Sequence, residues 1–240
     1  MGSINYQESD MYDVLIVGAG ISGINAAYRI HEGLPDKKFL LFEARDDLGG
    51  TWDLFKYPGI RSDSDLHTFS YPFKEWTGAD IAEGKHLVAY LKEVVRENGL
   101  AKHFRFRSKV QSADWSTEER CWFVTVNQQG EQMHYRTRFF YNCTGYYDYG
   151  TPYKADIPGI QNFKGKIVHP QFWNLSEDDY RDKRVAVIGS GATAITLIPN
   201  MAPVTSSLTL IQRSPSYIMS VAKFDPMAKL LRTILPPRAA

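Results

Sequence analysis

A glycine-rich segment near the N-terminus has the residue types and spacing that bind the pyrophosphate of a dinucleotide. Gly18-Ala-Gly20-Ile-Ser-Gly23 fits the pattern GxGxxG, and Glu43 follows Gly23 by about twenty residues. The first glycine of this pattern makes a tight turn, the second admits the pyrophosphate, and the third lets a helix pack on a strand. Glu43 can accept hydrogen bonds from ribose hydroxyls, and Ser22 either caps the helix or contacts the pyrophosphate. The alternative is a turn that binds no phosphate, with a glutamate on the surface.

A second glycine-rich segment, in the second half of the chain, differs from the first in the charge that follows it. It fits the variant GxGxxA and consists of Gly189, Ser190, Gly191, Ala192, Thr193 and Ala194. Arg213 and Ser214 stand where the first segment has its acid. A carboxylate there would repel a 2′-phosphate, whereas a guanidinium pairs with it through two hydrogen bonds. The sequence therefore predicts NADP rather than NAD at this site, against the alternative of a solvated arginine.

Both segments are flanked by the elements that such a site requires. A strand precedes each segment, a helix begins in it, and a second strand follows the helix. We expect these elements at Tyr12–Val17, Ile21–His31 and Phe39–Phe42, and again at Arg184–Ile188, Ala192–Met201 and Ser207–Gln212. A strand, a crossover helix and a second strand form a βαβ unit with parallel strands. The predicted fold class is therefore α/β, with two Rossmann-like dinucleotide-binding units.

The residues between the two units predict further elements and a domain boundary. We expect an ordered loop at Arg45–Thr68 and a helix at Lys85–Asn98, which ends before Gly99. An antiparallel meander is expected at Phe104–Val126, followed by a buried strand at His134–Asn142. The segment Gly150–Gly165 is rich in proline and glycine, which is typical of a boundary between domains. We therefore expect one dinucleotide-binding domain over residues 1–150 and a second over 151–240.

The overall composition excludes several classes of function. Lys and Arg number 28 and Asp and Glu 27, so the net charge of +1 gives no case for nucleic acid or an anionic membrane surface. The apolar run Val14–Val17 is far shorter than a membrane span. The two cysteines, Cys121 and Cys143, provide neither a disulfide framework nor the spacing of a metal site. We expect a cytoplasmic protein that holds no metal.

Two dinucleotide sites in one chain indicate hydride transfer from NADPH to a flavin. FAD is then the expected occupant of the first site and NADPH that of the second. A disulfide reductase would pass the electrons to two cysteines close together, but Cys121 and Cys143 are far apart in the sequence. The remaining major electron acceptor is O₂, so the pattern favours an oxygenase.

The segment before the second unit resembles the fingerprint of Baeyer–Villiger monooxygenases. Phe163, Gly165, His169 and Trp173 match FxGxxxHxxxW, and Asn174 stands where that family usually has Pro or Asp. Closely similar flavin monooxygenases share the pattern with a different last aromatic residue, so Trp173 favours the Baeyer–Villiger branch. Other segments are similar to the FAD loop and the domain hinge of the same family, at Gly49–Trp52, Tyr57–Asp65 and Cys143–Gly145.

The resemblance implies a class B flavin monooxygenase that inserts one oxygen atom of O₂ into ketones, or oxygenates sulfur or thioamide substrates, through a flavin peroxide. It also implies cofactor contacts from Thr51, Trp52, Asp53, Leu54, Asp63 and Val110 for FAD, and from Arg61 and Ser62 for NADP. Asp63 would be catalytic as the partner of an arginine absent from this chain. His169 would be a linker residue that changes conformation during turnover rather than a catalytic base.

Two alternatives stay open at this point. One is an N- or S-hydroxylating flavin monooxygenase, and the other is a catalytically inactive nucleotide-binding fragment. The resemblance also implies a longer chain that returns to complete the FAD domain, so we expect these 240 residues alone not to catalyse oxygenation.

Overall fold

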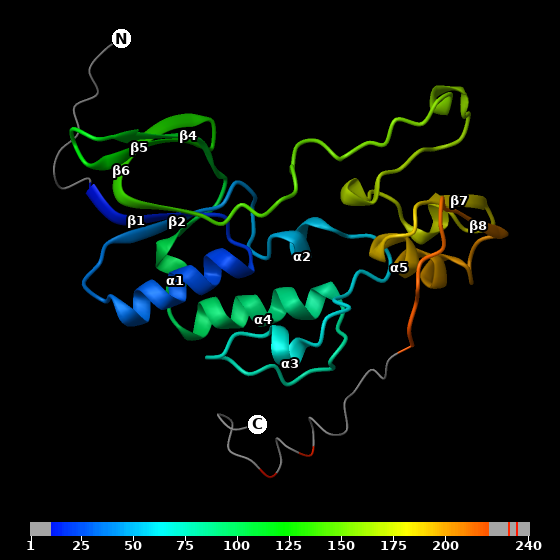
Figure 1. Cartoon of the computed structure of the whole chain (residues 1–240), viewed down its shortest axis with the longest axis horizontal. Coiled ribbons are helices and arrows are strands. Elements are labelled where there is room, and N and C mark those ends of the chain that lie inside the picture. Colours follow the sequence, from blue (N-terminus) through cyan, green and yellow to red (C-terminus); the bar gives the residue numbers. More distant parts are fainter. Residues whose placement is uncertain (1–10, 221–229, 231–233, 235–240) are drawn as a thin grey trace. The chain divides into compact units, whose positions relative to one another are not determined.

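The computed structural model describes residues 11–220 together with Leu230 and Ile234. This part of the chain forms two compact units (Figure 1). The first unit contains residues 11–53 and 88–147, and the second contains residues 54–87 and 148–220. The segment 54–87 therefore belongs to the second unit although it interrupts the first in the sequence.

The first unit is built on one six-stranded sheet. Its strands are β1 (Met11–Val17), β2 (Phe39–Phe42), β3 (Phe104–Arg105), β4 (Ser108–Ser116), β5 (Cys121–Gln128) and β6 (Glu131–Asn142). They lie in the order β3-β2-β1-β6-β5-β4, with parallel pairing from β3 to β6 and antiparallel pairing from β6 to β4. The helices are α1 (Ile21–Gly33), the short α2 (Thr51–Leu54) and α4 (Gly84–Glu97), followed by the 3₁₀ turn η2 (Leu100–His103).

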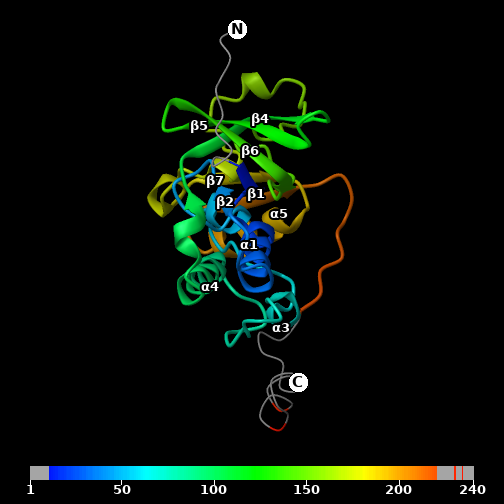
Figure 2. The ribbon, with the colours of Figure 1, turned by 90° about the vertical axis from the view of Figure 1, so that its left-hand side faces the viewer.

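Both faces of β1 and β2 are covered, which explains why these strands are continuous apolar runs rather than alternating ones. Figures 1 and 2 show α1 on one side of the two strands and the meander β4–β6 on the other. Between these two strands and the meander lies a core cluster that consists of Leu15, Leu40, Phe42, Val124 and Val126. This packing on both faces fixes the carboxyl ends of β1 and β2, where the first glycine turn lies.

The predicted burial of the strand His134–Asn142 is wrong. This segment is part of β6, which is both the third strand of the meander and the parallel partner of β1. Phe140 packs against the core cluster, but Phe139 is 69% exposed and Tyr141 54% exposed. Successive side chains of a strand point to opposite faces, and within residues 11–220 little covers the outer face here.

The second unit contains the second βαβ unit and several connecting segments. Strand β7 (Arg184–Ile188) leads into α5 (Ala192–Met201) and then into β8 (Ser207–Ile211), which pairs with β7 in parallel. The remaining elements are α3 (Leu66–Phe69) and the 3₁₀ turns η3 (Ile160–Asn162), η4 (Pro170–Phe172) and η5 (Glu177–Asp179). The predicted α/β class with two βαβ units is confirmed.

In the described part of the chain, no helix is long and apolar enough to cross a membrane.

Candidate functional site

The first glycine turn has a geometry that side chains would disrupt. Gly18 has a φ of +102°, and its N–H donates to the Phe42 carbonyl at 2.8 Å, which ties the turn to β2. A Cβ on Gly18 would lie 2.5 Å from the Cys143 carbonyl oxygen, and one on Gly23 would lie 1.8 Å from the Gly18 carbonyl oxygen. Both positions therefore require glycine, because side chains at such distances would collide with backbone.

The helix that follows this turn begins without a side-chain cap among the described residues. Gly20 is the N-cap of α1, and no described side chain caps the helix. The prediction that Ser22 is a possible N-cap is wrong, since Ser22 lies inside the first turn, where it is exposed. A Cβ on Gly20 would meet nothing closer than the Gly50 Cα at 3.6 Å, so the approach to the helix is open. Uncapped N–H groups and the helix dipole suit this end to a pyrophosphate.

Glu43 is buried directly beside the glycine turn. It is 4% exposed, which excludes the alternative of a surface glutamate. The Ala19 N–H donates to its Oε2 at 2.8 Å, and the Arg45 N–H donates to its Oε1 at 2.9 Å. Each carboxylate oxygen retains a lone pair that a ribose hydroxyl could use. Glu43 therefore holds the turn in place, a role that the sequence pattern did not indicate.

Substitution of Glu43 by glutamine is expected to destabilise the first unit by about 2 kcal/mol, the worth of a hydrogen bond to a charged group. A glutamine amide offers one oxygen, so one of the two backbone donors would face an NH₂ group. Urea denaturation and the FAD retained after desalting measure the effect, with the exposed Glu118→Gln as the matched control. Stability and FAD retention equal to those of the control would refute this role.

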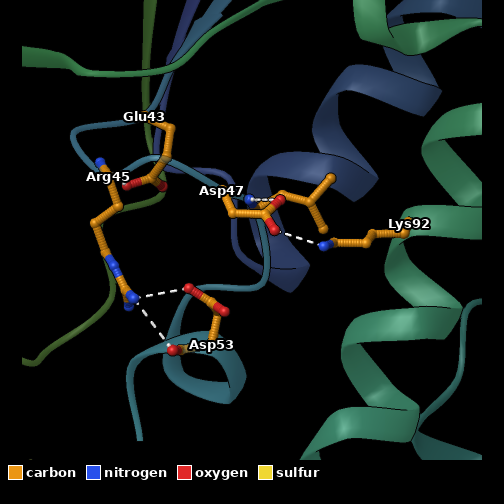
Figure 3. A network of polar contacts seen from close by, with 6 residues as sticks. Glu43, Arg45, Asp47, Asp53 and Lys92 are labelled. Atoms are coloured by element: carbon orange, nitrogen blue, oxygen red, sulfur yellow. Dashed lines mark hydrogen bonds and ion pairs between the residues drawn. The ribbon is translucent and has the colours of Figure 1, made fainter.

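The loop after β2 lies against the first glycine turn. The Gly49 N–H donates to the Ala19 carbonyl at 2.9 Å, so Thr51 and Trp52, at the start of α2, are held close to the turn. Figure 3 shows the polar contacts that fix this loop. Arg45 Nη2 donates to Asp53 Oδ2 at 2.7 Å, and Lys92 of α4 pairs with Asp47.

Two other residues with predicted FAD contacts are Leu54 and Val110. Leu54 ends α2 directly after Asp53, and the division between the two units falls between these two residues. Val110 lies in β4, where its side chain packs against the core cluster and the register with β5 shifts directly after it. The structure therefore brings Thr51, Trp52 and Asp53 to the turn, and it places Val110 among the core residues.

The second glycine turn has more open space around its glycines than the first. Gly189 has a φ of +122°, and its N–H donates to the Ile211 carbonyl at 2.9 Å. A Cβ at Gly189 or Gly191 would meet no described atom within 4 Å. Gly191 is the N-cap of α5 without a capping side chain from the described residues, and Ala192, Thr193 and Ala194 form the first turn.

The residues that follow β8 are exposed beside this turn. Gln212 separates the strand from Arg213 and Ser214, and neither of these two residues is buried. The Ser216 hydroxyl donates to the Ser190 carbonyl at 3.0 Å, which ties the segment after Arg213 back to the glycine turn. An exposed guanidinium at this edge is available for a 2′-phosphate, so the residues present fit NADP.

The second unit also contains the predicted nicotinamide-side residues. Arg61 Nε donates to Asp63 Oδ1 at 2.8 Å, and both side chains are substantially exposed. Ser62 is buried, and its hydroxyl donates to the Ser64 carbonyl at 3.2 Å. Arg61 and Asp63 thus belong to the same unit as the second glycine turn, whereas the Ser62 hydroxyl forms a hydrogen bond within its own loop.

The fingerprint segment is a loop in which His169 has a defined tautomer. Its Nε2 lies 3.1 Å from the Tyr153 carbonyl oxygen and its Nδ1 lies 3.3 Å from the Gln171 backbone nitrogen. A carbonyl can accept but not donate, so Nε2 carries the proton and Nδ1 is the acceptor. Gln171 is buried and donates to the Asp148 carbonyl, a contact that no local sequence pattern indicates. With both nitrogens engaged, His169 is placed as a linker between two stretches of loop.

The other fingerprint residues lie along the same loop. Phe163 is exposed, and a Cβ on Gly165 would lie 2.6 Å from its ring. Trp173 Nε1 donates to the Leu175 carbonyl at 3.0 Å, and its ring meets that of Tyr180 edge-on. These contacts stabilise the loop.

Tyr57 is a site residue that the sequence did not single out. It is 6% exposed and its hydroxyl forms a hydrogen bond with the Thr193 side chain, in the first turn of α5. Burial raises the pKa of the phenol, the nearby Asp63 carboxylate raises it further, and the hydrogen bond with Thr193 opposes these effects. Tyr57 therefore stays protonated at neutral pH. Its position in a loop far from Thr193 in the sequence carries no local signal of this contact.

Three side chains of the second unit lie close enough together to hold a metal ion, namely Asp65, His67 and Asp80. Their mutual contacts account for the arrangement. Asp65 caps α3 by accepting from the His67 N–H at 2.9 Å, and His67 Nε2 lies 2.7 Å from Asp80 Oδ1. We interpret the group as a set of structural contacts that hold α3 in place.

The thiols of the two cysteines are not activated for chemistry. Cys121 and Cys143 are free thiols, and burial raises the pKa of both. Neither is therefore a reactive thiolate at neutral pH, which agrees with the exclusion of a disulfide reductase.

Comparison with known proteins gives a consistent picture. The FAD-containing monooxygenase EthA of Mycolicibacterium smegmatis is 46% identical over 235 residues, which cover 97% of this chain and 47% of that protein. The putative FAD-containing monooxygenase MymA of Mycobacterium tuberculosis is 44% identical over 235 residues, which cover 95% of this chain and 47% of that protein. The chain thus spans about half the length of the curated relatives it matches.

Solved structures agree in fold. An open crystal structure of cyclohexanone monooxygenase has a TM-score of 0.78 at 29% identity and covers 92% of this chain and 44% of its own. A complex of OTEMO with FAD and NADP has a TM-score of 0.72 at 32% identity and covers 85% of this chain and 39% of its own. A model of the flavin-binding monooxygenase-like family matches residues 12–230. The chain therefore belongs to the flavin-binding monooxygenase-like family.

Proposed function

We propose that the chain functions in an NADPH- and FAD-dependent monooxygenase reaction. The observation that carries this proposal is the pair of glycine turns, each opening on a helix N-terminus that no described side chain caps. Such ends bind pyrophosphate through free N–H groups. Glu43 beside the first turn and Arg213 beside the second make the two ends chemically different, which supports FAD at one and NADPH at the other.

The chain's own residues would bind and orient the cofactors. FAD, when bound, supplies the redox and oxygen chemistry, and NADPH supplies the hydride. Gly20 and the first turn of α1 would hold the FAD pyrophosphate, with Thr51, Trp52 and Asp53 next to them. Gly191 and the first turn of α5 would hold the NADPH pyrophosphate, with Arg213 on the 2′-phosphate.

The proposed domains follow the sequence boundary near residue 150. Residues 1–150 would bind FAD and residues 151–240 NADPH, and part of the latter range lies outside the described residues. The segment 54–87 packs with the NADPH side, which supports a role for Arg61 near the nicotinamide. Two free cysteines support a reducing compartment, and we propose the cytoplasm.

The proposed substrates are small ketones, or compounds with an oxidisable sulfur or thioamide. The solved relatives include cyclohexanone monooxygenase, and Trp173 at the end of the fingerprint favours the Baeyer–Villiger type. An N- or S-hydroxylating monooxygenase is the second candidate, since EthA and MymA are described as FAD-containing monooxygenases without a stated reaction type.

Anaerobic mixing of the FAD-loaded chain with NADPH tests the first step of this function. We expect the flavin absorbance band to bleach with NADPH and to change far more slowly with equimolar NADH. Bleaching that is equally fast with both would contradict the assignment of the second site. A chain that retains both cofactors but leaves the flavin oxidised would contradict the proposed reaction.

Air oxidation by residues 1–240 alone is expected to release hydrogen peroxide rather than an ester from a cyclic ketone. The face of β6 that carries Phe139 and Tyr141 is open to water, and it adjoins the end of β1, where Val17 pairs with Asn142. Water near a reacting flavin favours this side reaction. The assay measures NADPH, peroxide and ester together. Ester formed in proportion to the NADPH consumed would show that these residues already exclude water.

A further inference from the structure

A short segment of the second unit, residues 57–63, is attached to α5 at two points, and we call it the strap. The Tyr57 hydroxyl forms a hydrogen bond with the Thr193 side chain. Two residues further along the strap, Gly59 has a φ of +77° and lies so close to α5 that a Cβ would be 2.0 Å from Asn200 Nδ2. Asn200 is itself fixed, since its Nδ2 donates to the Thr196 carbonyl at 2.7 Å. The strap therefore follows the position of α5.

The other edge of the strap is held by backbone pairing. The Ser62 N–H donates to the Ala82 carbonyl and the Gly84 N–H donates to the Ile60 carbonyl, each at 2.9 Å. Arg61 and Glu83 form an antiparallel bridge between these bonds. Because the backbone is attached on one edge and Tyr57 on the other, the side chains of Arg61 and Asp63 are carried by a segment whose position depends on both attachments.

Thr193 connects the strap to the second glycine turn. It lies in the first turn of α5, whose N–H groups have no capping side chain among the described residues. An anion bound there restricts the motion of that first turn, because its N–H groups become hydrogen-bonded. A side chain that is hydrogen-bonded to the same turn then becomes less mobile as well.

We propose that Tyr57 is a positioning residue that couples occupancy of the second dinucleotide site to the position of Arg61 and Asp63. This inference rests on the proposed function, since it assigns a dinucleotide to the turn before α5. Binding at Gly189–Ala194 fixes Thr193, Thr193 fixes the Tyr57 hydroxyl, and Tyr57 fixes the strap. The pair of charged side chains is thereby set in place when the dinucleotide is bound. By linkage, an ordered strap also raises the affinity for the dinucleotide.

Hydrogen exchange of the strap, measured on the full 240-residue chain with and without NADP⁺, tests the coupling. In the unsubstituted chain, saturating NADP⁺ is expected to slow exchange of the strap about fivefold, as one added hydrogen bond would. Tyr57→Phe keeps the buried ring and removes the hydroxyl. It should abolish this slowing while NADP⁺ affinity, from calorimetry, falls by no more than about fivefold.

Tyr180→Phe is the matched control, because Tyr180 is a buried tyrosine of the same unit whose ring packs against Trp173. It should leave the slowing intact. Asn200→Ala, which removes the second contact to the strap, should reduce the slowing as Tyr57→Phe does.

Three outcomes separate this inference from the function on which it rests. Equal slowing of the strap in Tyr57→Phe and in the unsubstituted chain would overturn the coupling alone. NADP⁺ that binds the unsubstituted chain without slowing the strap would do the same. A folded chain that fails to bind NADP⁺ in calorimetry would overturn the proposed function together with the coupling.

Discussion

Replacement of Gly23 by alanine is expected to destabilise the first unit by about 3 kcal/mol or more and to remove FAD binding. The added Cβ would lie 1.8 Å from the Gly18 carbonyl oxygen, and the neighbouring atom is backbone that cannot rotate away. The collision would push α1 off the strand and move the N–H groups that face the pyrophosphate. Chemical denaturation and the flavin absorbance after gel filtration measure the two effects.

Gly33→Ala provides the matched control in the same helix. A Cβ at Gly33 would meet no atom of the described residues within 4 Å, and alanine favours the helical conformation. Stability should therefore be unchanged or rise by up to about 1 kcal/mol, with FAD retained. A Gly23→Ala variant as stable as Gly33→Ala would show that α1 can shift freely and that the turn geometry is not required.

The second large effect concerns the choice of nicotinamide cofactor. Arg213→Ala is expected to weaken NADPH binding about tenfold or more and to leave NADH nearly unchanged, because the lost guanidinium pairs with the 2′-phosphate. The loss of NADPH affinity in Arg213→Ala should be smaller at higher salt, because the guanidinium is exposed and its charge is screened. Dissociation constants for both cofactors at two ionic strengths measure this.

Arg181→Ala serves as the control for Arg213→Ala, since Arg181 is an arginine of the same unit that pairs with Glu177 and Asp178. It should affect neither cofactor. Equal losses of NADPH and NADH affinity in Arg213→Ala would mean that Arg213 supports the fold of this edge rather than the 2′-phosphate.

The elements around the two glycine turns could be predicted because their signals are local. The apolar runs before and after each turn and the helical spacing within it depend on neighbours in the sequence. The predicted helix Ile21–His31 accordingly begins at its observed residue and ends close to the observed Gly33, and Arg184–Ile188 is β7 as predicted. The glycine positions also follow from local conformation, since Gly18 and Gly189 have positive φ angles.

What the sequence could not supply is contact between distant segments. The carboxylate of Glu43 is used by the N–H groups of Ala19 and Arg45, which no spacing rule indicates. The attachment of Tyr57 to Thr193 joins residues on either side of the whole meander. Exposure of Phe139 was unforeseen because an aromatic and β-branched run predicts a strand without showing which of its faces is covered.

A chain that holds two separate dinucleotide sites of different preference binds FAD and NADP⁺ at the same time. Calorimetric titration of NADP⁺ into the FAD-saturated 240-residue chain tests it most directly, with the flavin absorbance followed in parallel. NADP⁺ is expected to bind in a single equivalent while all the FAD stays bound, and Arg213→Ala is expected to weaken NADP⁺ binding without weakening FAD binding. Stoichiometric displacement of FAD by NADP⁺ would contradict it, because the two dinucleotides would then share one site.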